Sequence, residues 1–201
     1  MQRRFEFARA IGASIGVAAA LLAAVPAAAA GYMAMQGGVF GPWQGDVGYT
    51  LALQMLGSNA GGKSRWGGEF EYRNFDSSIV DVPGVEVESY IFRGMWQHHF
   101  APDRVVSPYL GLGLGIAIDV VDDHKVDRAR GVDTIGSTSA GLDGIFLFGV
   151  QAAIPGTDYL SVYGEGRVGF GFSVYGRNDT DRVQSENLGG ISGSLGLRFR
   201  F

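Results

Sequence analysis

Charged side chains recur at every second position in two stretches of the chain. Glu69, Glu71 and Arg73 alternate with aromatic residues, and Glu165 and Arg167 flank a glycine. Alternate positions of a β-strand point to the same face, so each stretch would hold charged groups side by side. Such groups could line a path for ions, or they could pair and fill an interior. We expect pairing, because an unpaired buried charge is expensive.

The histidines offer weaker chemistry. His98 and His99 are adjacent, and adjacent strand residues point to opposite faces, which disfavours joint binding of a metal. Asp122, Asp123 and His124 could hold a cation, but a solvated loop is the simpler interpretation. The chain has no cysteine, which excludes disulfides, thiolate metal sites and a lipid anchor on cysteine. We predict no catalytic group, no metal site and no cofactor.

The element that would position the charges is clearest in the last eleven residues, ISGSLGLRFRF. Its apolar residues, including Phe199 and Phe201, fall on one face of a strand. Its serines, Arg198 and Arg200 fall on the other face. A strand with an apolar outside and a polar inside is typical of a transmembrane β-barrel.

Seven further segments have strand features and end at turn residues. The predicted strands lie at 31–40, 47–55, 66–73, 85–97, 106–120, 142–154, 160–174 and 191–201. The fourth changes phase, which would require a β-bulge near 89–92. Short turns alternate with longer loops, the latter at 74–84, 122–141 and 175–187. This asymmetry predicts that both termini lie on the periplasmic side of an outer membrane.

Length and composition suit one domain of this kind. The 201 residues include 33 glycines, and 18% are charged, against about a quarter in soluble domains. No internal stretch is apolar over the roughly 20 residues that a spanning helix needs. The net charge of −4 indicates no affinity for nucleic acid.

The first 30 residues predict an export signal. Arg3 and Arg4 precede a run of apolar and small residues that ends at Ala30, which is typical of a secretory signal peptide cut after Ala30. An uncleaved membrane anchor is the alternative, but Pro26 and the small residues favour cleavage. The barrel domain would then comprise residues 31–201.

The predicted fold is all-β, a closed eight-stranded antiparallel up-and-down barrel. Closure removes the sheet edges, and side chains fill an interior of this size. Four acids and four bases face inward, namely Glu69, Glu71, Arg73, Arg93, Asp119, Glu165, Arg167 and Arg198. We expect Glu69 or Glu71 to pair with Arg93, and Glu165 to pair with Arg198. The candidates for aromatic girdles at the membrane surfaces are Trp66, Tyr72, Trp96 and Phe201.

Three segments resemble the small outer-membrane β-barrel proteins of Gram-negative bacteria, the porin-like and opacity-type surface proteins. WGGEFEYRNFD resembles their third strand, VVSPYLGLGLGIAI the fifth, and LGLRFRF the closing strand. The resemblance covers residues 31–201. It implies that outer-membrane lipids and lipopolysaccharide surround the barrel, and that the outer-membrane assembly machinery recognises the closing strand through Phe199 and Phe201.

Several functions stay open under this resemblance. A non-enzymatic barrel would stiffen the membrane or present its outer loops to a host or surface ligand, and a narrow channel is an alternative. Some barrels of this size modify lipid A, but the serine of the deacylase type is missing after His98 and His99. Asp76 and Ser77 with His124 match the palmitoyl-transferase type only weakly. A secreted soluble barrel would need the opposite polarity, so we predict the non-enzymatic barrel.

Overall fold

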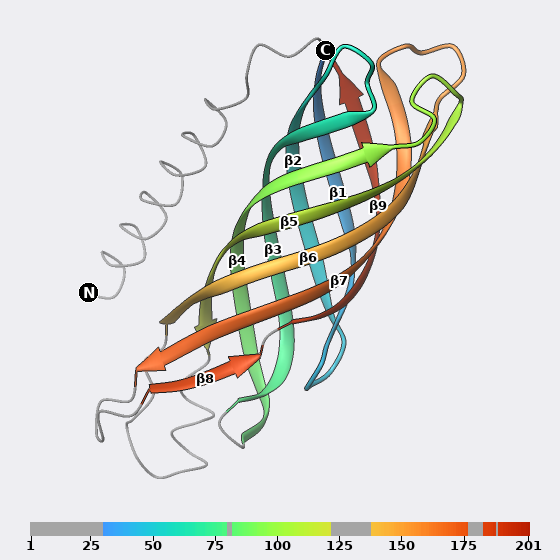
Figure 1. The fold of residues 1–201 in the computed structure, drawn as a ribbon. Helices are drawn as coiled ribbons and strands as arrows, with labels where there is room; N and C mark the ends of the chain where they lie inside the picture. Colours follow the sequence, from blue (N-terminus) through green and yellow to red (C-terminus); the bar gives the residue numbers. More distant parts are fainter. Residues whose placement is uncertain (1–29, 80–81, 122–137, 177–182, 188) are drawn as a thin grey trace, which may run out of the picture.

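The computed structural model describes residues 30–79, 82–121, 138–176, 183–187 and 189–201, which form strands and no helix (Figure 1). The strands are β1 (Ala30–Pro42), β2 (Gly48–Ser58), β3 (Ser64–Ile79), β4 (Val82–His99), β5 (Val106–Val121), β6 (Thr138–Ala153), β7 (Leu160–Gly176), β8 (Val183–Asn187) and β9 (Gly190–Arg200). Among these residues, none belongs to a helix long and apolar enough to cross a membrane. The predicted signal peptide lies outside the described residues, except for Ala30, which begins β1.

The sheet closes on itself as an antiparallel barrel. Each strand from β1 to β7 pairs with the next one along the chain, and β9 lies between β7 and β1. The closed ring therefore contains eight strands, which confirms the predicted fold class. Closure gives every strand of the ring two neighbours, so its backbone hydrogen-bonding groups are not left at an open edge.

The two ends of the barrel differ. Gly31 and Phe201 exchange backbone hydrogen bonds of 2.9 Å, so the first and last strands meet at one end, which we call the terminus end (top of Figure 1). The connections at this end are 59–63, 100–105 and 154–159. The opposite end, which we call the loop end, carries the connections 43–47, 80–81, 122–137 and the segment after β7.

One connection at the terminus end shows how the sequence sets a tight turn. Pro155 and Gly156 follow Ile154, and the backbone N–H of Thr157 donates to the Ile154 carbonyl at 3.1 Å. Gly156 has a φ of 84°. A type II turn requires a positive φ at its third position, which glycine adopts, and commonly has proline at its second.

The segment β8 is the continuation of β9 toward the loop end. On β7, Phe172 pairs with Asn187 of β8, and Gly169 pairs with Gly190 of β9. The spacing is the same on both sides, so the register is continuous across the interruption. The predicted loop at 175–187 is therefore wrong in part, because 183–187 extends the last strand.

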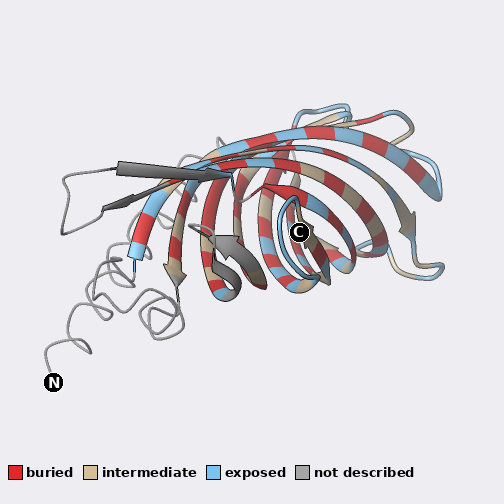
Figure 2. Cartoon of the chain, turned by 90° about the horizontal axis from the view of Figure 1, so that it is seen from below, coloured by how far each residue is buried: buried red, intermediate tan, exposed pale blue. Residues whose placement is uncertain are grey.

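Burial alternates along the strands, as the pattern of buried and exposed stripes in Figure 2 shows. On β5, Tyr109 and Asp119 are buried, whereas Leu112 and Leu114 are exposed. This alternation agrees with the predicted phase of the second, third, fifth, seventh and last strands. The outside of the barrel is therefore apolar, and the inside is mainly polar, with a buried apolar cluster that includes Leu56, Met95, Ile145 and Leu147.

The predicted bulge at 89–92 is wrong. β4 pairs with β3 without a shift from His98 to Val85, and the irregularity lies between Ser77 and Ile79 instead. Glu86 and Glu88, which suggested the change of phase, are on the outer face beyond the apolar zone. Polar residues on the outer face near the loop end imitate a phase change when the sequence is read alone.

The strands also extend farther toward the loop end than predicted. Asn74 pairs with Glu88 and Ile79 pairs with Val82, so most of the predicted loop at 74–84 belongs to β3 and β4. Likewise β6 begins at Thr138, inside the predicted loop at 122–141. In the extensions of β3 and β4, polar residues face outward while Phe75 and Val87 are buried, which is the inverse of the pattern that identifies a strand in the apolar zone.

Candidate functional site

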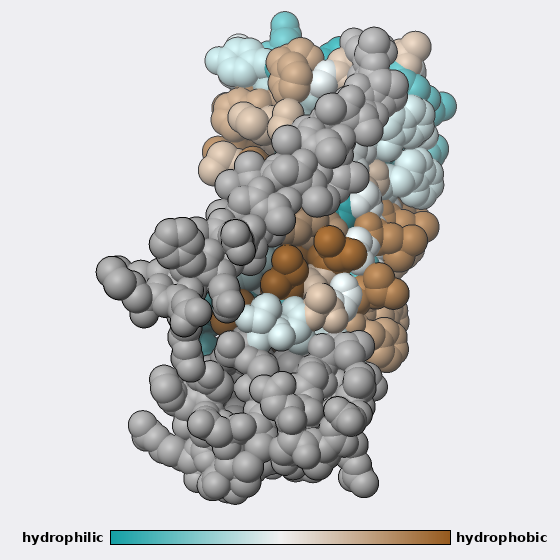
Figure 3. Space-filling view, turned by 90° about the vertical axis from the view of Figure 1, so that its left-hand side faces the viewer, coloured by the Kyte–Doolittle hydropathy of each residue, from teal (hydrophilic) through white to brown (hydrophobic). Residues whose placement is uncertain are grey.

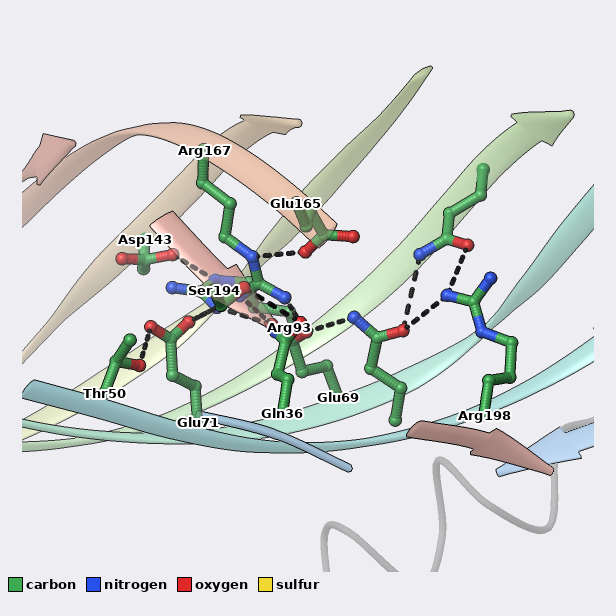
Figure 4. A network of polar contacts seen from close by, with 12 residues as sticks. Gln36, Thr50, Glu69, Glu71, Arg93, Asp143, Glu165, Arg167, Ser194 and Arg198 are labelled. Carbon is green, nitrogen blue, oxygen red and sulfur yellow. Dashed lines mark hydrogen bonds and ion pairs between the residues drawn. The ribbon is translucent and has the colours of Figure 1, made fainter. Parts of the chain in front are cut away.

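Charged side chains fill the middle of the barrel, and Arg93 of β4 lies among them (Figure 4). Its guanidinium is fully buried. The Nη1 atom donates to Glu69 Oε1 at 2.7 Å and also to Glu71, and the Nε atom donates to Asp143. One guanidinium group thus binds carboxylates from β3 and β6.

Arg167 of β7 extends these ion pairs across the barrel. It donates through Nη2 to Glu69 at 2.5 Å, through Nη1 to Glu71 at 2.9 Å and through Nε to Glu165 at 2.6 Å. Arg73 Nε donates to Glu71 at 2.8 Å. We call this group the central cluster, and its members are Glu69, Glu71, Arg73, Arg93, Asp143, Glu165 and Arg167.

Neutral donors supplement the guanidinium groups, because the central cluster holds one carboxylate more than it holds arginines. Thr50 Oγ1 donates to Glu71 at 2.7 Å, and the Tyr109 hydroxyl donates to Glu165 at 2.9 Å. Buried charges are tolerated when they are paired and their remaining hydrogen-bonding capacity is used. The central cluster meets the first condition, and it meets the second except at the Nη2 atom of Arg93, which is buried without a hydrogen-bond partner within the described chain.

Strand register and small residues make room for this cluster. Glu69 and Arg93 are direct cross-strand partners, so alternation alone points both side chains inward at one level. On the neighbouring strand, a Cβ at Gly113 would lie 3.2 Å from Arg93 Cδ and 2.5 Å from Met95 Sδ. The inward-facing glycine therefore leaves the space that a long side chain from the adjacent strand occupies.

A second polar cluster lies nearer the terminus end. Arg65 Nη1 and Arg198 Nη1 both donate to Oε1 of Gln151, at 2.8 and 2.7 Å. Arg198 Nη2 also reaches the amide oxygens of Gln97 and Gln54, at 3.2 and 3.3 Å. We call these five residues the arginine–glutamine cluster. Among the described residues, no carboxylate forms an ion pair with either of its arginines.

Aromatic rings support the two guanidinium groups of this cluster. The Arg65 guanidinium lies 3.9 Å from the ring centre of Tyr32, and that of Arg198 lies 4.6 Å from the ring centre of Tyr163. Such contacts stabilise a cation but supply no negative charge. The Nε atoms of both arginines are buried and make no hydrogen bond within the described chain. Two cations thus share one amide oxygen.

Asp119 stands apart from both clusters, near the loop end of β5. It accepts hydrogen bonds from the hydroxyls of Ser89, Ser139 and Ser173, the second at 3.5 Å. No arginine of the described residues pairs with it. Each hydroxyl comes from a different strand, so this carboxylate ties β4, β6 and β7 to β5.

The interior charges are sorted along the barrel. The buried described residues include five carboxylates and five guanidinium groups, so the interior is neutral as a whole. Asp119 and the surplus carboxylate of the central cluster lie toward the loop end and the middle. The two arginines without carboxylate partners lie toward the terminus end. That end of the interior is therefore positive.

The eight charged residues predicted to face inward, Glu69, Glu71, Arg73, Arg93, Asp119, Glu165, Arg167 and Arg198, are all buried. Arg93 binds both of the predicted carboxylates, Glu69 and Glu71. The structure also buries Asp143 and Arg65, which the sequence analysis did not single out. The alternation of the strands indicates that both residues face inward. Asp143, however, lies next to the start of the predicted strand 142–154, and Arg65 lies just before the predicted strand 66–73, so neither was included.

The predicted pair of Glu165 and Arg198 is wrong. Glu165 lies opposite Ser194, whereas Arg198 lies opposite Ser161, so the two side chains are at different levels of the barrel. Glu165 binds Arg167 instead, and Arg198 binds glutamines. The sequence correctly predicts that both side chains face inward. It does not give the register between β7 and β9, which decides the level of each side chain along the barrel.

The aromatic residues predicted for the girdles face outward. Trp66 and Trp96 are cross-strand partners and both are exposed. Tyr72 lies between Tyr49 and Tyr90, with ring centres 5.9 and 5.4 Å away. The tryptophans are near the terminus end of β3 and β4, and the tyrosines are nearer the loop end. The outer face thus carries aromatic residues at two levels, one near each end of the barrel.

The two histidines point to opposite faces. His98 lies outside, 6.1 Å from the Trp96 ring, whereas His99 is buried and stacks on Tyr109 at 4.7 Å. His99 Nδ1 is 3.3 Å from the Ser107 hydroxyl. A serine–histidine pair needs a third group to orient the imidazole, and no carboxylate of the described residues contacts His99.

The other candidate sites fall largely outside the described residues. Asp122, Asp123 and His124, the candidate cation site, lie outside them. The alternative lipid A site, formed by Asp76, Ser77 and His124, is therefore described only in part. Among the residues that the structure describes, no three His, Asp or Glu side chains are grouped so as to bind a metal ion.

Comparison with known proteins supports the fold. No family model and no curated protein matches the sequence. Neisserial surface protein A has a similar structure, with a TM-score of 0.59 and 16% identity over 86% of this chain and 97% of that one. The outer-membrane protein OprG from Pseudomonas aeruginosa is also similar, with a TM-score of 0.58 and 13% identity over 87% of this chain and 97% of that one. The chain has the closed eight-stranded fold of small outer-membrane β-barrels.

Proposed function

We propose that the chain is a non-enzymatic protein of the bacterial outer membrane, exported by residues 1–30 and inserted with both termini in the periplasm. The observation that carries this proposal is the inverted burial of the barrel. Arg93 is completely buried, whereas Leu114 and Leu195 are 76% and 75% exposed. In water such an arrangement would expose a large apolar belt, but in a bilayer the same belt contacts lipid tails.

The outer surface has the distribution that a bilayer requires. Figure 3 shows apolar side chains gathered over the middle of one face and more polar side chains toward the terminus end. The Trp66–Trp96 pair and the Tyr49–Tyr72–Tyr90 row lie at two levels that suit the two membrane surfaces. Outer-membrane lipids and lipopolysaccharide would surround this belt.

The interior favours a structural or surface-interaction role. In the central cluster the carboxylates and guanidinium groups bind one another, which leaves none of its groups positioned as an isolated acid, base or nucleophile. The cluster would hold the strands together, and the loop-end connections would meet a host or surface ligand. A chain of net charge −4 has no electrostatic attraction for nucleic acid.

Fractionation of a Gram-negative host that expresses the full chain tests the location. We expect the protein in the outer-membrane fraction, folded and resistant to extraction with urea. Recovery from the soluble periplasm would overturn the membrane assignment. Mass spectrometry of lipid A from the same cells tests the non-enzymatic role, and an altered acylation pattern in the expressing cells would contradict it.

A narrow channel is the second candidate, because a cavity of about 550 Å³ opens at the terminus end beside Arg65 and Gln151. The central cluster lies farther along the interior and would block ions. Planar bilayers separate the two functions. We expect no large, steady current from the purified protein, and a reproducible conductance carried by several kinds of ion would favour the channel.

The closing strand provides a further test, because we propose that Phe199 and Phe201 form its assembly signal. Phe201 is exposed, while its backbone is paired with Gly31. Deletion of Phe201 should reduce the amount of protein in the outer membrane more than any single substitution at 122–137. Normal insertion of the deletion variant, measured by surface protease accessibility, would refute this role.

A further inference from the structure

The arginine–glutamine cluster is short of acceptors. Arg65 is 2% exposed, yet its Nη1 must share the Gln151 oxygen with Arg198, and its Nε has no partner within the described chain. Two guanidinium groups that converge on one neutral oxygen repel each other, and the low polarity of the interior strengthens this repulsion. An oxyanion would supply both the acceptors and the missing charge.

The cavity at the terminus end provides the space for such an anion. Its wall contains Arg65 and Gln151 from the cluster, and Arg104 and Arg200 from the rim. The volume of about 550 Å³ falls within the range of small-molecule sites, which is about 300–1,000 Å³. A water-soluble anion could enter without crossing the apolar belt, because the cavity lies at the mouth of the barrel.

The rim also carries two acids, Asp103 and Asp158. They belong to the turns 100–105 and 154–159, whereas Arg65 is buried in β3. The three arginines of the wall outnumber these acids, and Arg198 adds a further positive charge behind Gln151. The balance of charge next to Gln151 is positive.

We propose that this cavity is a binding site for a small oxyanion, a phosphate or a carboxylate, which Arg65 in the wall holds in place of the shared Gln151 oxygen, with Arg198 behind Gln151 as the second cation. Planar guanidinium groups recognise phosphate and carboxylate through paired hydrogen bonds, and the Nε atom of Arg65 has no partner within the described chain. Tyr32, which stacks on Arg65, fixes the plane of that group. The site lies at the opposite end from the loop-end connections, and it is linked to the central cluster through Gln54, whose Nε2 donates to Glu69 at 2.8 Å.

Calorimetric titration of the folded protein in dodecyl maltoside, a detergent without phosphate, tests the proposal. Inorganic phosphate and glutarate are the two probes, at constant ionic strength. We expect saturable binding of at least one, and the stronger probe identifies the preferred oxyanion. Phosphatidylglycerol added to the micelles shows whether a lipid headgroup competes for the same site. Saturable binding of neither probe would overturn the proposal.

Two variants separate a built site from general attraction to positive charge. Gln151→Glu places a carboxylate between the two guanidinium groups, and it should weaken binding at least about tenfold while the barrel stays folded. Arg65→Gln should have a similar effect, and Gln151→Glu keeps the test valid if Arg65→Gln does not fold. Asp158→Asn is the matched control, with unchanged or tighter binding expected. Unchanged affinity in Gln151→Glu would refute the site.

Discussion

The central cluster and the arginine–glutamine cluster occupy the same barrel but satisfy their charges differently. Arg93 binds three carboxylates, whereas Arg198 binds only amide oxygens and stacks on tyrosines. The first arrangement pairs each guanidinium group with a carboxylate, and the second lacks a counter-charge. The difference teaches that one barrel interior can combine a part whose charges pair with one another and a part whose cations are left with neutral partners.

Removal of one arginine from each cluster should give the largest difference in the free energy of unfolding between the two clusters. Arg93→Ala leaves Glu69, Glu71 and Asp143 with fewer partners, and it should lower the free energy of unfolding by about 3–5 kcal/mol, as expected for a broken buried ion pair. Arg198→Ala leaves no carboxylate unpaired and should cost about 1–2 kcal/mol. Urea unfolding in detergent micelles measures both. Equal losses would mean that the two clusters do not differ in this way.

The sequence predicts most of this interior, because alternation is a reliable guide wherever the outer face of the strand is apolar and the inner face is polar. It assigns Glu69, Glu71 and Arg93 correctly for this reason. It fails where the polarity of the two faces is inverted, as in the loop-end part of β3 and β4, because Phe75 and Val87 are buried there while Glu86 and Glu88 face outward. That failure produced the false bulge at 89–92 and the loops that proved to be strand.

The sequence is a poorer guide to which charges meet. Parity places Glu165 and Arg198 inside, but the stagger between β7 and β9 separates them. Stagger is a property of the closed barrel and has no local signal in either strand. The two clusters are therefore visible only in the structure, since the same inward residues with another stagger would form different pairs.

Two tyrosines offer a finer test, because both lie beside Arg198 and only one reaches a carboxylate. The Tyr109 hydroxyl donates to Glu165 at 2.9 Å, whereas the buried Tyr163 hydroxyl has no partner within the described residues. Tyr109→Phe should lower the free energy of unfolding by about 1–3 kcal/mol, the value of a hydrogen bond to a charged group. Tyr163→Phe should leave it unchanged or raise it slightly. The reverse order would show that the hydroxyl contacts do not distinguish the clusters.

The smallest expected effect is that of Gln151→Glu, which would give the arginine–glutamine cluster a carboxylate like those of the central cluster. In Gln151→Glu the new carboxylate would bind Arg65 and Arg198, two charges that are already buried, so no further cation must be desolvated. We expect the free energy of unfolding to rise by about 1 kcal/mol, since charged hydrogen bonds are stronger than neutral ones.

Gln36→Glu is the matched control for this gain. Gln36 is also buried, but it accepts a hydrogen bond from the Ser194 hydroxyl at 3.1 Å, and no guanidinium group of the described residues donates to it. A carboxylate there should lower the free energy of unfolding by about 1–3 kcal/mol, the cost of a buried polar group left without an adequate partner. Opposite signs for the two glutamines would show that a missing counter-charge, rather than tolerance of any acid, defines the arginine–glutamine cluster. The same sign for both would contradict that definition.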